Sequence, residues 1–530
     1  MWLASSLCGA PLPAQPSGLE RAGAAARWFA HVEALADDEM RGRETGSPEH
    51  RKAAEYVATR FAAAGLVPAG TNGYYQPVHL TSRRIVEPSS SLSLVTNGSA
   101  SPVALGDEAI FGLRLDPAER VEAAIVFAGF GLRIPEVGHD DFAGLDVKGK
   151  VVAYVAGSPA SASSALGAHY QSAWVRAATL RALGAVGTIA IPNPKSMDVP
   201  WVRTSANRLN PAMTLADPEL ADTAGMQVAL TWNPAHAERL FEGSGHTFAS
   251  LVGMAEARQP LPRFPLRPTL RAAVAVERES IVSDNVVGLL KGSDPTLMHE
   301  YVVLTAHLDH LGVGAPIGGD AIYNGAMDNA SGIATLIETA SAVAAARPKR
   351  SVLFVAVTAE EKGLLGSRYF ARNPTVPQEG VVANINMDMF LPLYPLKSLM
   401  VLGLGESDLT DDVRATAQDL GLAVQPDPQP LRNRFIRSDQ YSFIREGVPA
   451  LAMKVGVEAG SPEAAIDAAW TRERYHAPSD DLQQPIDKEA AATFTEAIGR
   501  LAVRVANRAA RPAWASDSFF KRFAGGGSSR

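Results

Sequence analysis

Cysteine is almost absent from this sequence, which has Cys8 as its single example. A chain with one cysteine cannot form an intrachain disulfide, and it cannot build a zinc site from thiolates. Any metal site in this protein must therefore use histidines and carboxylates.

Long apolar runs and clusters of basic residues are also missing. No stretch of about 18 uninterrupted apolar residues occurs, so the sequence predicts no membrane-spanning helix. The formal net charge is −7, the pI is near 5.9, and lysines and arginines form no dense stripe. These features argue against nucleic acid or an anionic membrane as a partner and favour a small-molecule or peptide substrate.

The chain has 530 residues, of which 46% are hydrophobic and 20% are charged. This length predicts two to four domains, or one large domain that carries an insertion. Residues 1–20 are apolar but have no basic n-region, so we interpret them as the remnant of a signal peptide or as an unstructured leader. The first interpretation implies export to the periplasm or the extracellular space, and the second allows a cytoplasmic protein.

The remaining sequence falls into two regions with different residue patterns. Between residues 111 and 274, short β-branched runs lie between Gly and Pro residues, and one helical stretch, Ala173 to Leu183, falls among them. This pattern predicts a separate β-rich α+β unit. From about residue 275 to 510, strands alternate with helices, which predicts an α/β fold with a mostly parallel sheet flanked by helices.

Two further segments can be predicted from local signals. Ser47 and Pro48 have the pattern of a helix N-cap followed by the first helical residue. A C-terminal helix should run from Lys488 to about Arg508, and we expect the tail that follows it, residues 511–530, to be mobile.

Residues suited to metal chemistry follow three of the predicted strands. His307 and Asp309 come after one, Glu360 and Glu361 after the next, and Asp388 after a third. Because ligands bind at the carboxyl ends of strands in open α/β sheets, these side chains should converge. A carboxylate from Asp309 could hold the imidazole of His307 in its metal-binding tautomer. Of the two adjacent glutamates, one could bind a cation while the other accepts a proton from water.

Two other candidates lie in loops. Asp328 stands in a glycine-bracketed turn before a helix, where it could cap the helix or bridge two cations. His476 lies in a turn-like loop and could be an ordinary loop histidine or a ligand. The candidate ligands are thus two histidines and three carboxylates, a set that suits zinc, manganese or cobalt.

These residues belong to motifs that resemble those of the M28 family of zinc aminopeptidases, in the same order and with similar spacing. The motifs are His307-x-Asp309, Gly325-Ala326-x-Asp328-Asn329, Glu360-Glu361-x-Gly363, Asn386-x-Asp388 and Tyr475-His476-x-Pro478. Gly129-Phe130-Gly131 and residues 140–152 resemble the protease-associated (PA) insert of that family. The resemblance implies a discontinuous peptidase domain at residues 21–110 and 275–510, with a PA-like insert at 111–274.

The resemblance also implies roles and a cofactor. Two zinc ions per chain would be held by His307 and Asp388, by Glu361 and His476, and by Asp328 as the bridge. Glu360 would be the general base, and Asp309 would support the catalytic site from behind the ligands. The segment Ser438-Asp439-Gln440 resembles the family's Ser-Asp-His near the substrate pocket, with Gln440 in place of His. The resemblance suggests Asp439 of this segment and Tyr475, next to His476, as substrate-binding residues.

The expected activity is removal of N-terminal residues from peptides. Three alternatives remain open: a carboxypeptidase, a relative of glutaminyl cyclases, and a binding scaffold without catalysis. The cyclases use one metal, so the presence of the full set of five ligands argues against that alternative. The oligomeric state and the accepted side chains cannot be derived from the sequence.

Overall fold

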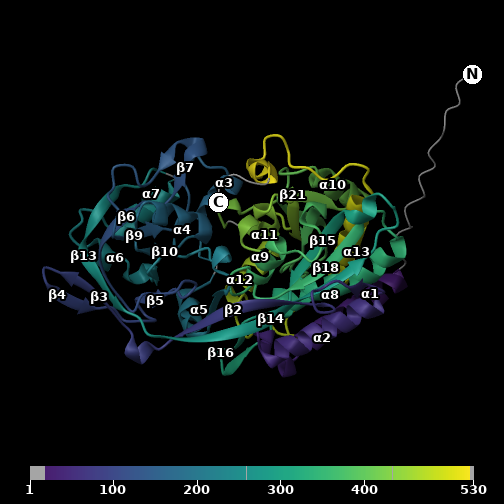
Figure 1. Cartoon of the computed structure of the whole chain (residues 1–530), viewed down its shortest axis with the longest axis horizontal. Coiled ribbons are helices and arrows are strands. Elements are labelled where there is room, and N and C mark those ends of the chain that lie inside the picture. Colours follow the sequence, from purple (N-terminus) through teal and green to yellow (C-terminus); the bar gives the residue numbers. More distant parts are fainter. Residues whose placement is uncertain (1–17, 198, 258, 433, 526–530) are drawn as a thin grey trace, which may run out of the picture.

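The computed structural model describes residues 18–525 except positions 198, 258 and 433. These residues form two lobes, each built around its own sheet (Figure 1). The first 17 residues of the predicted leader lie outside the described part, so export stays a prediction. Within that part, none of the helices has the length and apolar character needed to cross a membrane.

The larger sheet has a parallel centre, and its flanking strands pair antiparallel except for β20 and β21, which are parallel to each other. Its strand order is β11–β2–β14–β18–β15–β19–β22–β20–β21, with β1 beside β14. The parallel strands are β18 (Ser351–Val357), β15 (Tyr301–His307), β19 (Val381–Asn386) and β22 (Ala450–Val455). The others are β11 (Ala212–Leu215), β2 (Tyr75–Ile85), β14 (Val276–Leu290), β1 (Val67–Pro68), β20 (Ser398–Leu402) and β21 (Ala423–Pro426). The α/β prediction is therefore confirmed for the centre, whereas the sheet as a whole is mixed.

Helices cover both faces of this sheet. One face carries α1 (Gly18–Leu35), α2 (Pro48–Ala63), α8 (Ser331–Ala346) and α13 (Lys488–Asn507), with α10 (Leu409–Asp419) beside α13. The other face carries α9 (Leu365–Arg372) and α11 (Gln440–Arg445), and α12 (Pro462–Glu473) precedes the loop that contains His476. The predicted cap is confirmed, because the Ser47 hydroxyl accepts a hydrogen bond from the His50 amide at the start of α2.

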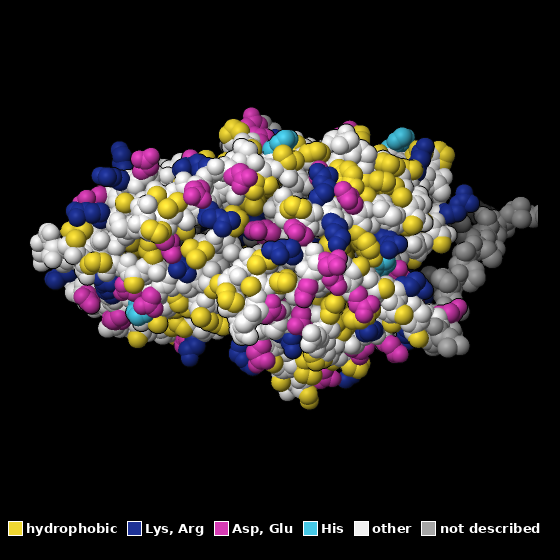
Figure 2. Space-filling model, turned by 90° about the horizontal axis from the view of Figure 1, so that it is seen from below, with side chains coloured by type: hydrophobic (Ala, Val, Ile, Leu, Met, Phe, Trp, Pro, Cys, Tyr) yellow, Lys and Arg dark blue, Asp and Glu magenta, His cyan; other side chains and the backbone are white. Residues whose placement is uncertain are grey.

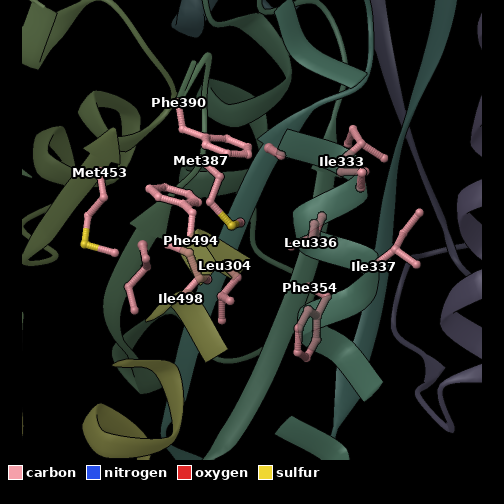
Figure 3. Packing of buried hydrophobic residues seen from close by; sticks show 14 of the residues in the cluster. Leu304, Ile333, Leu336, Ile337, Phe354, Met387, Phe390, Met453, Phe494 and Ile498 are labelled. Atoms are coloured by element: carbon pink, nitrogen blue, oxygen red, sulfur yellow. The ribbon is translucent and has the colours of Figure 1, made fainter. Parts of the chain in front are cut away.

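The main core lies between the sheet and the first of these helical layers. Figure 3 shows Leu304 and Phe354 of the sheet facing Leu336 of α8, with Phe494 of α13 nearby. Phe494 stacks on Phe390, and their ring centroids are 4.1 Å apart. Since all five side chains are fully buried, this packing stabilises the strands whose ends carry the candidate ligands.

The second lobe is an insert, residues 91–273, with its own mixed sheet. The strands lie in the order β4 (Ser99–Pro102), β3 (Ser91–Thr96), β13 (Arg263–Ala273), β6 (Arg120–Ala128), β9 (Val151–Val155), β10 (Gly187–Ile191), β12 (Val228–Trp232) and β5 (Ala109–Phe111). Its helices are α3 (Ser164–Gln171), α4 (Ala173–Ala182), α5 (Trp201–Ala206), α6 (Glu238–Phe241) and α7 (Phe248–Glu256). The long strands β2 and β14 pair along the lower edge of Figure 1 and join the two lobes.

The sheets divide the chain differently from the expected boundaries in two places. The sheet of the insert already begins at Ser91, about twenty residues before the boundary placed at 111, because β3 pairs with β13. Conversely, β11 (Ala212–Leu215), which was expected within the insert, pairs with β2 and so extends the larger sheet. Neither pairing is visible locally, since each joins segments far apart in sequence.

The tail after residue 510 also differs from expectation. Residues 511–525 fold back onto the larger lobe, and the 3-10 helix Phe519–Gly525 buries Phe520 completely. The ring of Phe520 packs against Phe435 and Trp514, with centroids 5.4 and 6.0 Å away. These aromatic side chains hold the tail in place, so the prediction of a mobile tail is wrong for this part, and residues 526–530 lie outside the described structure.

Candidate metal centre

The candidate ligands meet at the carboxyl edge of the parallel strands. His307 is the last residue of β15, Glu360 and Glu361 follow β18, and Asp388 follows β19. β15 pairs in parallel with both β18 and β19, so the three strand ends lie side by side. Loops that precede α8 and follow α12 bring Asp328 and His476 to the same place.

A first cluster consists of His307, Asp328 and Asp388. Nε2 of His307 lies 3.2 Å from Oδ1 of Asp328 and 3.3 Å from Oδ1 of Asp388. The other ring nitrogen, Nδ1, lies 3.0 Å from the backbone carbonyl of Asp309. If Nδ1–H donates to that carbonyl, the lone pair of Nε2 is left for a cation.

A second cluster shares Asp328 with the first. Nε2 of His476 lies 3.4 Å from Oδ2 of Asp328 and 3.2 Å from Oε2 of Glu361. Nδ1 of His310 lies 2.7 Å from Oε1 of Glu361. The two carboxylate oxygens of Asp328 therefore face different clusters, which is the arrangement expected of a bridging ligand.

The donor set and its spacing fit zinc. Zinc binds histidine nitrogen and carboxylate oxygen at about 2.0–2.2 Å in tetrahedral sites, which puts ligand atoms about 3.4 Å apart. The separations of 3.2 to 3.4 Å in both clusters match that spacing. Oδ2 of Asp328 and Oε1 of Glu361 are buried and have no hydrogen-bond partner. Buried charged oxygens rarely remain unpaired, so bound cations would satisfy them.

Neighbouring imidazoles and carboxylates perturb one another in the protein without metal. Although burial raises it, the pKa of Asp388 is lowered by the imidazole of His307. Burial likewise raises the pKa of Glu361, but His476 and His310 outweigh it and hold this pKa well below its usual range. Both carboxylates are thus in the ionised state that a metal ligand requires.

Backbone contacts fix the turn that carries Asp328. The carboxylate of Asp480 accepts hydrogen bonds from the amides of Met327 and Asp328, at 2.9 and 3.0 Å. The fully buried Arg43 donates to four backbone carbonyls, among them those of Asn324, Gly325 and Leu308. Arg43 thus ties the turn before Asp328 to the end of β15, and its positive charge lies near the acidic centre.

Asp309 has a different role from the one expected. Its backbone carbonyl, and not its carboxylate, faces the ring of His307. The carboxylate instead accepts hydrogen bonds from the amides of Glu360 and Glu361, at 3.0 and 3.3 Å, and from the hydroxyl of Thr45 at 2.9 Å. Asp309 therefore orients the turn of the two glutamates, because its side chain points along the strand edge toward β18.

Glu360 belongs to neither cluster, although it is adjacent to Glu361. Burial, together with the charges of Glu361, Asp388 and Asp439, raises its pKa well above the usual range, against the opposing effect of His307. The preceding residue, Ala359, has a left-handed backbone with φ of 56°. Such a conformation is costly for alanine, so the surrounding structure must hold the turn that carries the two glutamates.

The two expected substrate residues lie close to the centre, and their role stays a prediction. Asp439 is completely buried, both of its carboxylate oxygens lack a hydrogen-bond partner, and burial raises its pKa to about 7. The ring of Tyr475 lies 3.9 Å from that of His476. Gln440 is buried and structural, because it accepts a hydrogen bond from Asn386 and donates one to the carbonyl of Phe435.

The insert reaches the centre through two arginines that were not predicted. Arg114 donates to the backbone carbonyl of Glu361 at 2.8 Å. Arg203 of α5 donates to the backbone carbonyls of Tyr475 and Arg472, on either side of the bend that leads to His476. Sequence reasoning could not find these contacts, because each joins the insert to a loop more than 200 residues away.

His310 was also missed, although it stands next to Asp309 in the same motif. A third histidine beside a predicted ligand was the available signal.

A shared bridging aspartate at the edge of an α/β sheet defines the class of two-metal hydrolytic centres. A sequence model of Peptidase family M28 matches residues 285–502, which contain all five predicted ligands.

Known proteins resemble the chain over different extents. It is 26% identical over 297 residues to “Probable leucine aminopeptidase 2” of Aspergillus fumigatus, which covers 51% of this chain and 55% of the relative. It is 40% identical over 104 residues to “Probable zinc metalloprotease” of Pyricularia oryzae, covering 19% of this chain and 20% of the relative. The chain thus spans about half the length, or less, of these curated relatives.

A solved structure shares the fold of both lobes. The aminopeptidase from Aneurinibacillus sp. strain AM-1 aligns with a TM-score of 0.53 and 20% sequence identity, over 92% of this chain and 94% of that one. The arrangement of the larger lobe and the insert is therefore one that occurs in a known protein.

Proposed function

We propose that this protein is a zinc-dependent aminopeptidase with two metal ions per chain. The observation that carries the proposal is the position of Asp328, whose two oxygens face His307 and Asp388 on one side and His476 and Glu361 on the other. The names of the relatives, a leucine aminopeptidase and a zinc metalloprotease, support the same conclusion.

The residues have separable roles in this proposal. Bound zinc would lower the pKa of a water molecule toward neutrality and polarise the scissile carbonyl. Glu360, which belongs to neither cluster, accepts the proton of the attacking water and gives it to the leaving amine. Asp309 holds the Glu360 amide and so fixes the direction of this base.

Replacement of the base tests the mechanism. In Glu360→Gln, we expect two zinc ions per chain, as in the wild type, and a loss of at least about 100-fold in kcat, because general base catalysis contributes about 10²–10⁴-fold. Zinc is counted by elemental analysis. Activity near that of the wild type would show that Glu360 is not the base.

A second experiment tests the preference for a free N-terminus. Matched peptides with a free or an acetylated α-amino group are digested, and the products are identified by mass spectrometry. We expect cleavage only of the free form, one residue at a time from the N-terminus. Equal cleavage of both, or release of C-terminal residues, would favour the carboxypeptidase alternative, and no cleavage of either would favour a scaffold.

A further inference from the structure

His310 is a buried histidine that the proposed ligand set does not use. It is fully buried, and neither of its ring nitrogens has a hydrogen-bond partner. Among the other histidines of the described chain, His50 and His139 each have one buried nitrogen, Nε2, without a hydrogen-bond partner, whereas both nitrogens of His310 are buried and unpartnered. Because buried polar atoms are nearly always satisfied, the two free nitrogens of His310 require an explanation.

The surroundings of the ring indicate what would satisfy one of them. Nδ1 lies 2.7 Å from Oε1 of Glu361 and 3.9 Å from Oδ2 of Asp328. All three atoms are buried and without a hydrogen-bond partner. Nδ1 and Oε1 are close, but their contact lacks the geometry of a hydrogen bond, so neither atom satisfies the other. The three residues each offer one ligand atom, all within 4.8 Å of one another, so they are close enough to bind one metal ion together.

Glu361 offers one oxygen to each of two imidazoles. Its Oε1 faces His310, and its Oε2 lies 3.2 Å from Nε2 of His476. The two rings are in edge-to-face orientation, with centroids 6.0 Å apart. The carboxylate therefore lies between two histidines, and Asp328 contacts both of them.

Contacts with the neighbouring backbone position the ring of His310. The amide of His310 donates to the carbonyl of Arg43 at 3.3 Å, and the ring packs on Gly325. A Cβ atom at position 325 would lie 2.6 Å from the imidazole, and the φ of +64° there also favours glycine. The glycine before the Asp328 turn thus leaves room for this side chain.

We propose that Nδ1 of His310 is a sixth metal-binding group, which completes the second position of the proposed two-zinc site. The second position then has four protein residues, His310, His476, Glu361 and Asp328. The first has only three, His307, Asp388 and Asp328. Four protein ligands are typical of a closed zinc site, whereas three leave a place for water or substrate. This inference rests on the proposed function and makes the first position the open one.

Zinc affinity of a variant tests the inference. His310→Asn removes the imidazole and keeps a small polar side chain, and His79→Asn, at an exposed position of β2, is the matched control. Zinc is withdrawn with a graded series of chelator-buffered solutions, and the bound metal is measured by elemental analysis. For His310→Asn we expect one of two zinc ions to bind at least about tenfold more weakly, since even outer-shell changes cost about 10–100-fold. The control should match the wild type.

The outcomes separate this inference from the proposed function. A wild type that binds fewer than two zinc ions would overturn the two-metal proposal and this inference with it. A wild type with two ions and a His310→Asn variant with unchanged affinity at both positions would overturn the role of His310 alone.

The wild-type protein provides a second test that does not depend on the folding of a variant. Cobalt(II) replaces zinc, and proton NMR detects the ring N–H groups of coordinated histidines as strongly shifted signals that vanish in D₂O. We expect signals from three histidines, His307, His310 and His476. Signals from only two would contradict the proposal.

Discussion

Arg203 of the insert donates a hydrogen bond to the backbone carbonyl of Tyr475, the residue that precedes the predicted ligand His476. Its second nitrogen donates to the carbonyl of Arg472. His476 itself has a left-handed backbone, with φ of 55°. Because a non-glycine residue in this conformation must be held by its surroundings, the insert contributes to the shape of the metal centre.

Arg203→Ala should therefore weaken metal binding at the second position and lower kcat/KM by about tenfold or more, the effect of losing an outer-shell contact. Arg203→Lys can restore one of the two hydrogen bonds and should recover part of the affinity. Zinc titration and steady-state kinetics provide the measurements. Arg271→Ala is the control, since Arg271 lies in the same lobe and pairs with Glu122 at the surface. If both alanine variants bind zinc like the wild type, the contact has no positioning role.

Removal of zinc should destabilise the larger lobe. Without cations, the carboxylates of Asp328, Glu361 and Asp388 repel one another in a buried space. A site at 100 times its Kd stabilises the folded state by about 2.7 kcal/mol. We expect a chelator to lower Tm by several degrees and added zinc, but not magnesium, to restore it. A Tm that is indifferent to chelation would contradict a metal centre in this position.

The tail should contribute to stability. Phe520→Ala removes a completely buried ring from contact with Phe435 and Trp514, and such truncations cost about 3–5 kcal/mol. Denaturant titration measures the loss, and Lys521→Ala, at an exposed position, serves as the control. Equal stability of the two variants would mean that the tail does not hold to the lobe in solution.

His169 should make stability depend on pH. This histidine belongs to α3 of the insert and packs against Phe519 of the tail. Its Nδ1 is 2.9 Å from the hydroxyl of Tyr441. Burial lowers its pKa from 6.5 to about 3, and Arg522 acts in the same direction. The unfolded chain therefore binds a proton between these pH values while the folded chain does not. Stability must fall as the pH falls through this window, by up to about 1.4 kcal/mol per unit.

The change that tests this dependence is His169→Asn, which cannot titrate. Its unfolding free energy should fall less steeply than that of the wild type between pH 6.5 and 4.5, when each protein is compared with its own value at pH 8. Denaturant titrations at these pH values measure the slopes. Parallel slopes would show that His169 is not held in its neutral form.

Sequence patterns predicted those residues of the centre that directly follow a strand in the sequence. Glu360, Glu361 and Asp388 directly follow apolar strands, so their meeting at one edge could be expected. Asp328 and His476 lie in loops, and only the family pattern indicated where they go. Arg203 and the pairing of β11 with β2 depend on contacts between distant segments, which no local pattern encodes.

On the surface, basic and acidic side chains are interspersed over the face in Figure 2. This distribution agrees with the absence of a basic stripe in the sequence.

The position of the insert in the chain has a consequence for biosynthesis. Residues 91–273 leave the ribosome before any of the proposed ligands, and His476 leaves it last. Since domains fold as units during synthesis, with N-terminal segments first, α5 and its Arg203 can already be in place when the final ligand emerges. The loop that carries His476 is thus the last of the proposed ligand segments to be synthesised, and its contacts with Arg203 join it to a lobe made earlier.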